Sequence, residues 1–313
     1  MSIDPAYSGG IEILVRGKRI LLDPVRMPES KPDIIIVSHA HRDHYNIKVL
    51  NSFPDATIIL SNETYNLITR RNRLKSKKII KLEENYIEVE DIQFEFFEAN
   101  HIIGSRQVLI DGEIAYTGDI CLEKRIIFNP PKILKANTLI IEATYGNPLY
   151  IFPDRKILYR KILKKIIRDF FNHGKAIVYA RSPGVAQELI KLFSKLKIDV
   201  YVHKAIYTHA QLYSENGCNL NRYYIADSLN EEGVYIYPIW FGKNDEGLGI
   251  FVTGWAAIEK EDRFIPLSSH SGLDKLLKYV EESNAQRIYT VYGYARKFSD
   301  ILRKHDFDAI SLW

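Results

Sequence analysis

Short apolar runs divide the first half of the chain into predicted strands. Ile11–Val15 and Arg19–Leu22 flank a turn at Gly17, which predicts a β-hairpin. Asp33–Val37 is a short, nearly continuous apolar run, typical of a buried strand. Further strands are predicted at Ala56–Leu60, Lys78–Lys81, Tyr86–Val89, Ile92–Glu98, Gln107–Ile110, Ile114–Thr117 and Thr138–Glu142, with a helix at Glu63–Arg70. Strands interspersed with helices predict a layered α/β architecture.

The pattern changes near residue 150. Apolar residues recur every four positions within Asp154–Phe171, which predicts an amphipathic helix. We then expect, in order, a strand at Lys175–Ala180, a helix at Val185–Leu196, strands at Asp199–His203, Gly233–Trp240 and Gly249–Val252, a strand at 264–266, a helix at Leu273–Glu282, a strand at Arg287–Val291, a helix at Ala295–His305 and a strand at Ala309–Leu312. The first pattern returns from about Gly249 onward.

Composition indicates a globular protein in a reducing compartment. The 313 residues are 46% hydrophobic, which suffices for a large core. An apolar run of about 18 residues is missing, so we expect no membrane span. The start at Met1–Pro5 lacks a basic region before an apolar stretch, so we expect no signal peptide. Cys121 and Cys218 form no CxxC pattern, which argues against disulfides and thiolate zinc sites and favours the cytoplasm.

Positive charge is concentrated in the middle of the chain. The net charge is +4, and residues 151–252 contain 15 Lys and Arg against 10 Asp and Glu, whereas the rest contains 28 against 29. An anionic partner such as a nucleic acid becomes more plausible, although a solvated Lys-rich surface explains the same pattern.

The segment Ser38-His39-Ala40-His41-Arg42-Asp43-His44 is the strongest chemical signal in the sequence. It follows the buried strand Asp33–Val37, and loops at the carboxyl ends of strands present catalytic groups in α/β proteins. Imidazole nitrogen and carboxylate oxygen suit zinc or manganese. The segment therefore predicts a metal site.

Two more residues are expected to join this site. His101 follows the strand Ile92–Glu98, and Asp119 follows the strand Ile114–Thr117. Each stands at a strand end, as the first cluster does, so we predict that both are ligands.

The order Asp23, His39–His44, His101 and Asp119 resembles the metallo-β-lactamase superfamily. The resemblance implies a first metal held by residues that match His39, His41, His101 and Asp119. It implies a second metal held by Asp43, His44 and the bridging Asp119. Asp23 matches the acidic residue that supports the metal loop.

The second half of the chain resembles the β-CASP nucleases of that superfamily. Ile141-Glu142-Ala143-Thr144-Tyr145-Gly146 is similar to their motif A, and Pro266–Ser271 to their motif B, with His270 as its histidine. The insertion between them matches the β-CASP cap. The implied fold is an αββα sandwich, residues 1–150 and 253–313, with an inserted α/β β-CASP cap domain, residues 151–252.

Motif C departs from the usual pattern. The strand-turn Thr290-Val291-Tyr292-Gly293 matches it, but most β-CASP RNA nucleases carry a histidine ligand where this chain has Tyr292. Phenol is a poor zinc ligand because its ordinary pKa is about 10. The resemblance thus implies one complete Zn²⁺ site, with Mn²⁺ as an alternative ion, and a weaker second site.

Two subfamilies are most similar: the ligase-associated DNA exonucleases, and the RNA-directed branch of mRNA 3′-end processing endonucleases. The departure at Tyr292 favours DNA over RNA. We expect hydrolysis of phosphodiester bonds by metal-activated water, with Asp43 or Asp119 as proton acceptor. His270, partnered by Glu142, is expected to stabilise the transition state or to protonate the leaving oxygen.

Candidate substrate-binding residues lie at two turns and at motif C. The turn Arg181-Ser182-Pro183-Gly184 precedes a helix whose first N–H groups can bind phosphate, although a plain strand-helix turn explains it equally well. The resemblance also makes Ser268 and Ser269 candidates for a terminal-phosphate pocket, since crosslink-repair exonucleases place such a pocket near motif B, and Tyr292 a candidate for a substrate contact. An RNA-processing nuclease, a small-molecule hydrolase and a non-catalytic scaffold remain as alternatives, and the oligomeric state is open.

Overall fold

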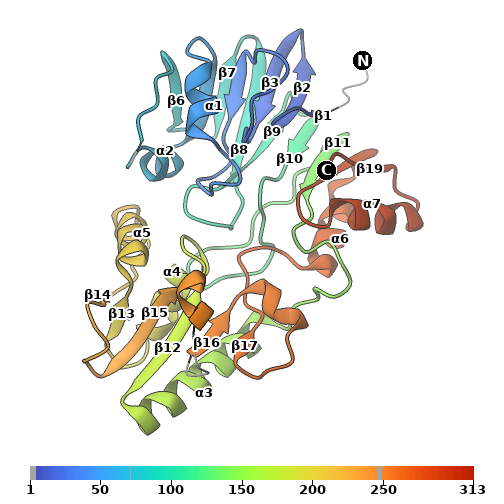
Figure 1. The fold of residues 1–313 in the computed structure, drawn as a ribbon. Coiled ribbons are helices and arrows are strands. Elements are labelled where there is room, and N and C mark those ends of the chain that lie inside the picture. Colours follow the sequence, from blue (N-terminus) through green and yellow to red (C-terminus); the bar gives the residue numbers. More distant parts are fainter. Residues whose placement is uncertain (1–4, 71, 245–248) are drawn as a thin grey trace. The chain divides into compact units, whose positions relative to one another are not determined.

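The computed structural model describes residues 5–70, 72–244 and 249–313. Met1 to Asp4, which belong to the start where we expect no signal peptide, therefore lie outside the described residues. The chain forms two compact units (Figure 1). The first comprises Met1–Cys121, Pro131–Asn147 and Leu273–Trp313, and the second comprises Leu122–Pro130 and Pro148–Gly272.

The first unit contains two sheets. One has the order β1-β2-β3-β4-β5-β6, with β1 (Ala6–Tyr7), β2 (Ile11–Val15), β3 (Lys18–Leu22), β4 (Ile34–Ile36), β5 (Thr57–Ser61) and β6 (Lys78–Leu82). The other has the order β19-β18-β11-β10-β9-β8-β7, with β7 (Tyr86–Val89), β8 (Ile92–Glu98), β9 (Arg106–Ile110), β10 (Ile114–Tyr116), β11 (Thr138–Glu142), β18 (Arg287–Val291) and β19 (Ala309–Ser311). Their alternating apolar residues meet in one buried core.

Helices cover the outer faces of both sheets. α1 (Ile47–Ser52) and α2 (Asn62–Thr69) pack on the first sheet through a second apolar cluster that includes Val49 and Ile68. α7 (Ala295–Lys304) contacts β18 and β19, and α6 (Leu273–Ser283) buries Leu276 and Tyr279. The unit is therefore the αββα sandwich expected from the sequence.

The second unit is a parallel α/β sheet. Its order is β14-β13-β15-β12-β16-β17, with β12 (Lys175–Ala180), β13 (Val200–Val202), β14 (Tyr224–Ile225), β15 (Gly233–Pro238), β16 (Gly249–Val252) and β17 (Phe264–Ile265), and every described pairing is parallel. Helices α3 (Arg155–His173), α4 (Val185–Phe193) and α5 (Lys204–Glu215) pack against it, with 3₁₀ helices at Ile239–Asn244 and Gly254–Ile258.

The bounds of the second unit differ from the predicted cap, residues 151–252. β17 pairs with β16, so the sheet continues beyond residue 252. Arg125, from the segment Leu122–Pro130, forms an ion pair with Glu188 of α4 and ties that segment to the same unit. Long-range pairing of this kind leaves no local signal in the sequence.

Two α-helices of the described residues were not predicted, the short α1 and α5. α5 buries Ile206, Ala210 and Tyr213, a helical spacing of apolar residues that the sequence does contain. The predicted strand Gly233–Trp240 ends two residues early, at Pro238, where a 3₁₀ helix begins. Among the described residues, no helix is long and apolar enough to cross a bilayer.

Candidate metal centre

The histidine loop, residues 38–44, follows the carboxyl end of β4. β4 is a fully buried strand that pairs in parallel with β3 and β5. Backbone hydrogen bonds fix its first residues, because Val37 N donates to Ile59 O and Arg106 N donates to Ser38 O. Ile59 belongs to the first sheet and Arg106 to the second. The loop is therefore anchored to both sheets just before its first histidine.

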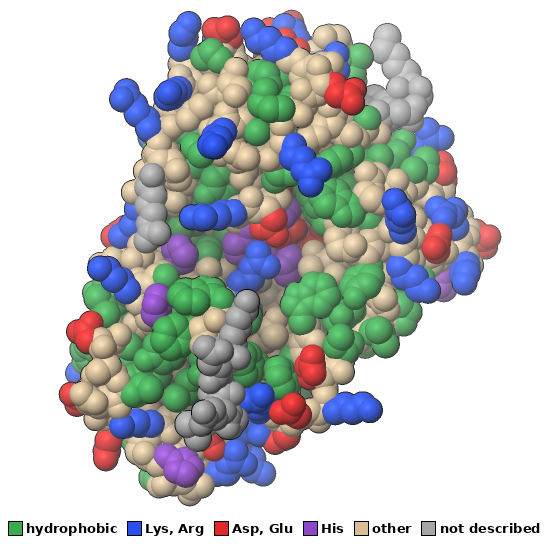
Figure 2. Space-filling model, in the orientation of Figure 1, with side chains coloured by type: hydrophobic (Ala, Val, Ile, Leu, Met, Phe, Trp, Pro, Cys, Tyr) green, Lys and Arg blue, Asp and Glu red, His purple; other side chains and the backbone are tan. Residues whose placement is uncertain are grey.

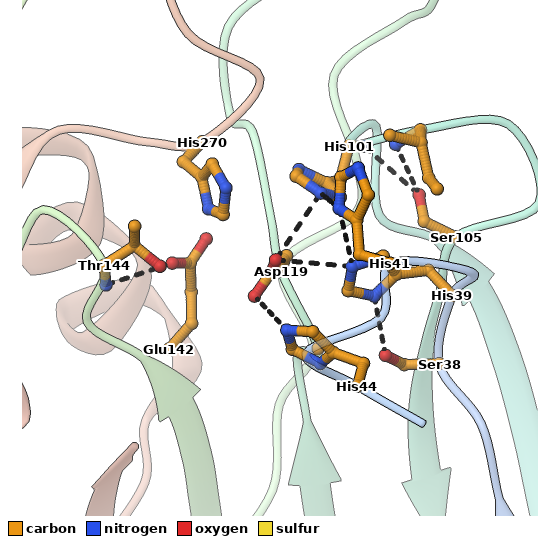
Figure 3. A network of polar contacts seen from close by, with 12 residues as sticks. Ser38, His39, His41, His44, His101, Ser105, Asp119, Glu142, Thr144 and His270 are labelled. Atoms are coloured by element: carbon orange, nitrogen blue, oxygen red, sulfur yellow. Dashed lines mark hydrogen bonds and ion pairs between the residues drawn. The ribbon is translucent and has the colours of Figure 1, made fainter. Parts of the chain in front are cut away.

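Four buried side chains place one donor atom each around a common point (Figure 3). His41 Nδ1 lies 3.1 Å from His39 Nε2 and 2.9 Å from His101 Nε2. Asp119 Oδ2 lies 3.4 Å from both Nε2 atoms. Ligands about 2.0–2.1 Å from a tetrahedral zinc ion stand about 3.3–3.4 Å apart. The donor set therefore fits a divalent metal ion.

The protonation of His39 suits this role. Burial lowers its pKa and outweighs the opposing effect of Asp119, which favours the neutral imidazole that binds metals. Its ring is fully buried.

Asp119 reaches the cluster from the loop after β10. Gly118 precedes it with a φ of 53°, and a Cβ at this position would lie 2.9 Å from the Ser38 side chain. Only glycine combines this backbone conformation with so close an approach. The glycine before Asp119 is therefore a requirement of the loop geometry.

Glu142, at the end of β11, holds the other side of the Asp119 loop. One carboxylate oxygen accepts a hydrogen bond from Ile120 N at 2.8 Å, and the other accepts one from Thr144 N at 3.1 Å. Glu142 is fully buried. Within the first unit its side chain thus positions the residue that follows Asp119.

Asp23 organises the polar contacts beneath the cluster. It accepts hydrogen bonds from Ser38 N at 2.7 Å, Ser38 Oγ at 2.6 Å and Tyr116 Oη at 2.6 Å. Its Oδ2 also lies 2.7 Å from His44 Nδ1. Since a carboxylate only accepts, His44 Nδ1 carries a proton, and His44 Nε2 lies 3.3 Å from Asp119.

The same argument fixes His39. The Ser38 hydroxyl gives its single proton to Asp23, so at 2.9 Å it accepts from His39 Nδ1–H. The lone pair of His39 Nε2 is then directed at the cluster. These contacts are those of a residue that orients metal ligands, and the supporting role that the resemblance implies for Asp23 stays a prediction.

His44 differs from His39 in its electrostatics. Burial alone would lower its pKa, but the carboxylates of Asp119 and Asp23 outweigh burial and raise the pKa well above the ordinary value. Asp43, its neighbour, is exposed and belongs to neither donor group of the first unit, whose second group is Asp23, His39 and His44. The role of Asp43 as a ligand stays a prediction.

Tyr292 lies against His44. Its ring meets the His44 ring edge-on at 4.7 Å, and its hydroxyl lies 3.0 Å from that of Tyr116. Burial and the nearby Asp23 raise its pKa well above the ordinary value. The neutral phenol therefore extends the hydrogen-bond chain to Asp23, and these contacts do not support a ligand role.

The motif B residues belong to the second unit. Ser268, Ser269 and His270 are buried and follow β17, and His270 N donates to Ser268 Oγ at 3.0 Å. Arg155 donates to Ser268 O, and Ser271 Oγ accepts from Leu122 N at 2.9 Å. The loop is thus held rigidly within its own unit. Its catalytic and phosphate-binding roles stay predictions.

The turn after β12 uses some of its backbone donors internally. Gly184 N donates to Gln187 Oε1 at 2.8 Å, and Ala186 N donates to Arg181 O at 2.9 Å. Phosphate binding by Arg181, Ser182 and Gly184 stays a prediction.

Sequence reasoning missed a buried ionic cluster. Glu188 of α4 pairs with Arg125 at 2.7 Å and with Arg155 at 2.6 Å, and Tyr159 donates to it. Burial alone would raise the pKa of Glu188, but the two guanidinium groups outweigh it and hold the pKa below the ordinary value. Glu188 beside the apolar residues of the helix Val185–Phe193 was the available signal.

Comparisons with known proteins find relatives of this chain. Residues 11–128 match the family model of the β-lactamase superfamily domain. A probable DNA ligase of Opitutus terrae is 29% identical over 293 residues, which cover 87% of this chain and 28% of that protein. An RNase J-like protein of Methanocaldococcus jannaschii is 32% identical over 213 residues, 59% of this chain and 51% of that protein.

The chain thus spans between about a quarter and about a half of the length of these relatives. A solved structure of a protein of unknown function from Enterococcus faecalis has the same fold, with a TM-score of 0.61, 16% identity and 94% of both chains covered. The motifs at Glu142 and His270, the αββα sandwich with its α/β insertion, and these relatives lead to one conclusion: the chain belongs to the β-CASP family of the metallo-β-lactamase superfamily.

Proposed function

We propose that this protein is a metal-dependent nuclease that hydrolyses phosphodiester bonds. The observation that carries the proposal is the group of four buried donors on His39, His41, His101 and Asp119. Their separations of 2.9–3.4 Å match a compact nitrogen and oxygen site, for which Zn²⁺ is our first choice and Mn²⁺ the alternative.

The residues around the centre have separable tasks. A bound divalent cation supplies a lowered water pKa and neutralises charge on phosphate oxygens. Asp119, or the exposed Asp43, accepts the proton of the attacking water. Asp23 keeps the histidines in the ligating tautomer, and Glu142 anchors the Asp119 loop. His270 is the proposed proton donor to the leaving oxygen.

DNA is the proposed substrate. The relative that matches 87% of this chain is named a probable DNA ligase. Tyr292 also stands where RNA nucleases of the family carry a histidine ligand. The alternative, RNA, is favoured by the RNase J-like relative at 32% identity.

Cleavage assays test both the metal-dependent nuclease activity and the preference for DNA. End-labelled single-stranded DNA and RNA of one sequence are incubated with the purified protein, with and without Zn²⁺ or Mn²⁺. We expect metal-dependent degradation of DNA and little of RNA. His39→Ala and Asp119→Ala should abolish cleavage and bound metal, measured by elemental analysis, whereas His173→Ala, at the end of α3, should change neither.

The outcomes separate the alternatives. Degradation of RNA with DNA intact would overturn the DNA assignment but keep the nuclease. Metal binding without cleavage of either polymer would overturn the nuclease proposal itself.

A further inference from the structure

A pocket opens at the carboxyl ends of the central strands of the second unit. Its volume is about 440 Å³, and it is lined by Ala180, Arg181, Ser182, Pro238, Ile239, Trp240 and Phe251. These residues come from the ends of β12 and β15 and from β16, neighbours in the parallel sheet. Ligands of open parallel sheets bind at this edge, where the strand order reverses. The pocket is large enough for a small ligand.

One wall of this pocket is aromatic. Trp240 is 59% exposed, a large fraction for a tryptophan. The His203 ring packs edge-on against the Trp240 ring, with ring centroids 5.6 Å apart. Phe251 packs on Tyr179 at 4.8 Å, and the Tyr179 ring is buried. The rings are held in place by other rings, so a planar ligand meets a preorganised surface.

The surroundings of this wall are visible on the molecular surface. Figure 2 shows hydrophobic side chains gathered on the second unit, in the region where Figure 1 places β15 and β16. The exposed Phe241 neighbours Trp240, with ring centroids 5.9 Å apart, and its ring stacks on Tyr237 at 4.6 Å and 12°.

The polar side of the pocket is positive. Arg181 is exposed and is the charged residue among the described lining residues, which include no carboxylate. Ser182 Oγ lies beside it and is held by Gln187 Nε2 at 2.9 Å and His209 Nδ1 at 3.0 Å. A guanidinium group binds phosphate through paired hydrogen bonds. A ligand with a planar ring and an adjacent anionic group matches both sides of the pocket.

We infer that this pocket binds one nucleotide of single-stranded nucleic acid, its base stacked on Trp240 and its phosphate at Arg181. The inference rests on the proposed function and adds a site on the second unit that grips the strand. Base–aromatic stacking tolerates any base, so the pocket contributes affinity without sequence preference. Loss of one such contact weakens binding by about 5- to 150-fold.

Binding without cleavage tests the site directly. Fluorescence anisotropy is measured in EDTA with the full chain and labelled oligothymidylate, oligouridylate and an all-abasic strand of equal charge. Trp240→Ala should weaken binding of the two base-bearing strands at least about fivefold and leave the abasic strand unchanged. Trp240→Phe should restore most of the affinity.

Matched variants separate the contacts. Trp255→Ala removes another exposed tryptophan of the same unit, outside the pocket, and should leave binding unchanged. Arg181→Ala should weaken all three strands and reduce the salt dependence of binding by about one phosphate contact. A stronger effect on oligouridylate than on oligothymidylate would identify RNA as the preferred strand.

The result that overturns the inference is equal affinity of Trp240→Ala and wild type for all strands. If the wild type cleaves nucleic acid and that equality holds, this site falls while the nuclease proposal stands. If Trp240→Ala weakens binding but no cleavage occurs under any metal condition, the site stands and the nuclease proposal falls. If the wild type binds none of the strands, this site falls, and an apolar segment of a protein becomes the candidate occupant.

Discussion

Asp23 connects most of the polar groups beneath the metal cluster. It takes the proton of the Ser38 hydroxyl and so leaves His39 with its Nε2 lone pair for metal. It also holds His44 through Nδ1 and accepts from Tyr116. One buried carboxylate therefore sets the tautomers of two candidate ligands, which a change of one residue can test.

We expect Asp23→Asn to lower metal affinity by about 10- to 100-fold, because an amide does not enforce these tautomers. Competition with a fluorescent zinc chelator measures the affinity. Asp33→Asn is the matched control, since Asp33 is exposed, accepts from Arg19 N and belongs to neither donor group of the first unit. Unchanged affinity in Asp23→Asn would remove the supporting role of Asp23.

Among the elements of the second unit, α3 and α4 meet through charge as well as apolar packing. Arg155 begins α3, Glu188 lies in α4, and Arg125 approaches from the segment before Pro131, all buried. Arg155 also donates to Ser268 O, the carbonyl two residues before His270. The cluster thus ties the motif B loop to two helices.

Glu188→Gln should destabilise the second unit by about 3–5 kcal/mol at neutral pH, because the buried guanidinium groups of Arg125 and Arg155 both lose the Glu188 carboxylate. Since the folded pKa of Glu188 is lowered, its stabilising effect is present above the pKa of the unfolded chain and is lost as pH falls through the folded value. Urea unfolding at a series of pH values should therefore show the wild type and the variant converging in acid.

Asp262→Asn is the control for this experiment. Asp262 pairs with Lys161 and Lys165 but its side chain is 71% exposed, so the change should cost about 1 kcal/mol or less. Equal effects of the two variants would contradict a special role for the buried cluster.

At the scale of the whole molecule, the chain crosses between the two units several times. The first unit is assembled from three segments and the second from two. All donors of the four-residue group lie in the first unit, in loops after β4, β8 and β10. A metal bound there stabilises the fold of the first unit directly, and the second unit has no share in that donor group.

Metal removal should therefore destabilise the first unit and leave the second unit unchanged. At a free metal concentration of about 100 Kd, binding stabilises the folded state by about 2.7 kcal/mol. Hydrogen exchange followed by mass spectrometry should show EDTA lowering protection in the loops at 38–44, 100–105 and 118–121, while β12, β15 and β16 stay unchanged. His39→Ala should show no response to EDTA, and an equal response of both units would contradict the localisation of the metal.

Much of the architecture followed from local patterns. The apolar run Asp33–Val37 contains the buried strand β4. The helical spacing of Leu158, Ile162 and Ile166 places all three on the buried face of α3. Such patterns succeed because burial acts on residues at a fixed local period. The helix α5, which was not predicted, has the same kind of apolar spacing. The bounds of the second unit were not predicted correctly, because they depend on strand pairing between segments that are distant in the sequence.

The sequence by itself determined which donors can gather, because His39 and His41 share one short loop and His101 and Asp119 each stand at a strand end. Only the tertiary structure decided how these donors are oriented. Tyr116 lies 93 residues from Asp23, and Tyr292 lies 176 from Tyr116, yet their hydroxyls form one chain with the Asp23 carboxylate. Which atom donates and which accepts in such a hydrogen-bond chain depends on atoms that folding brings to within about 3 Å of one another. A local sequence pattern does not contain this information.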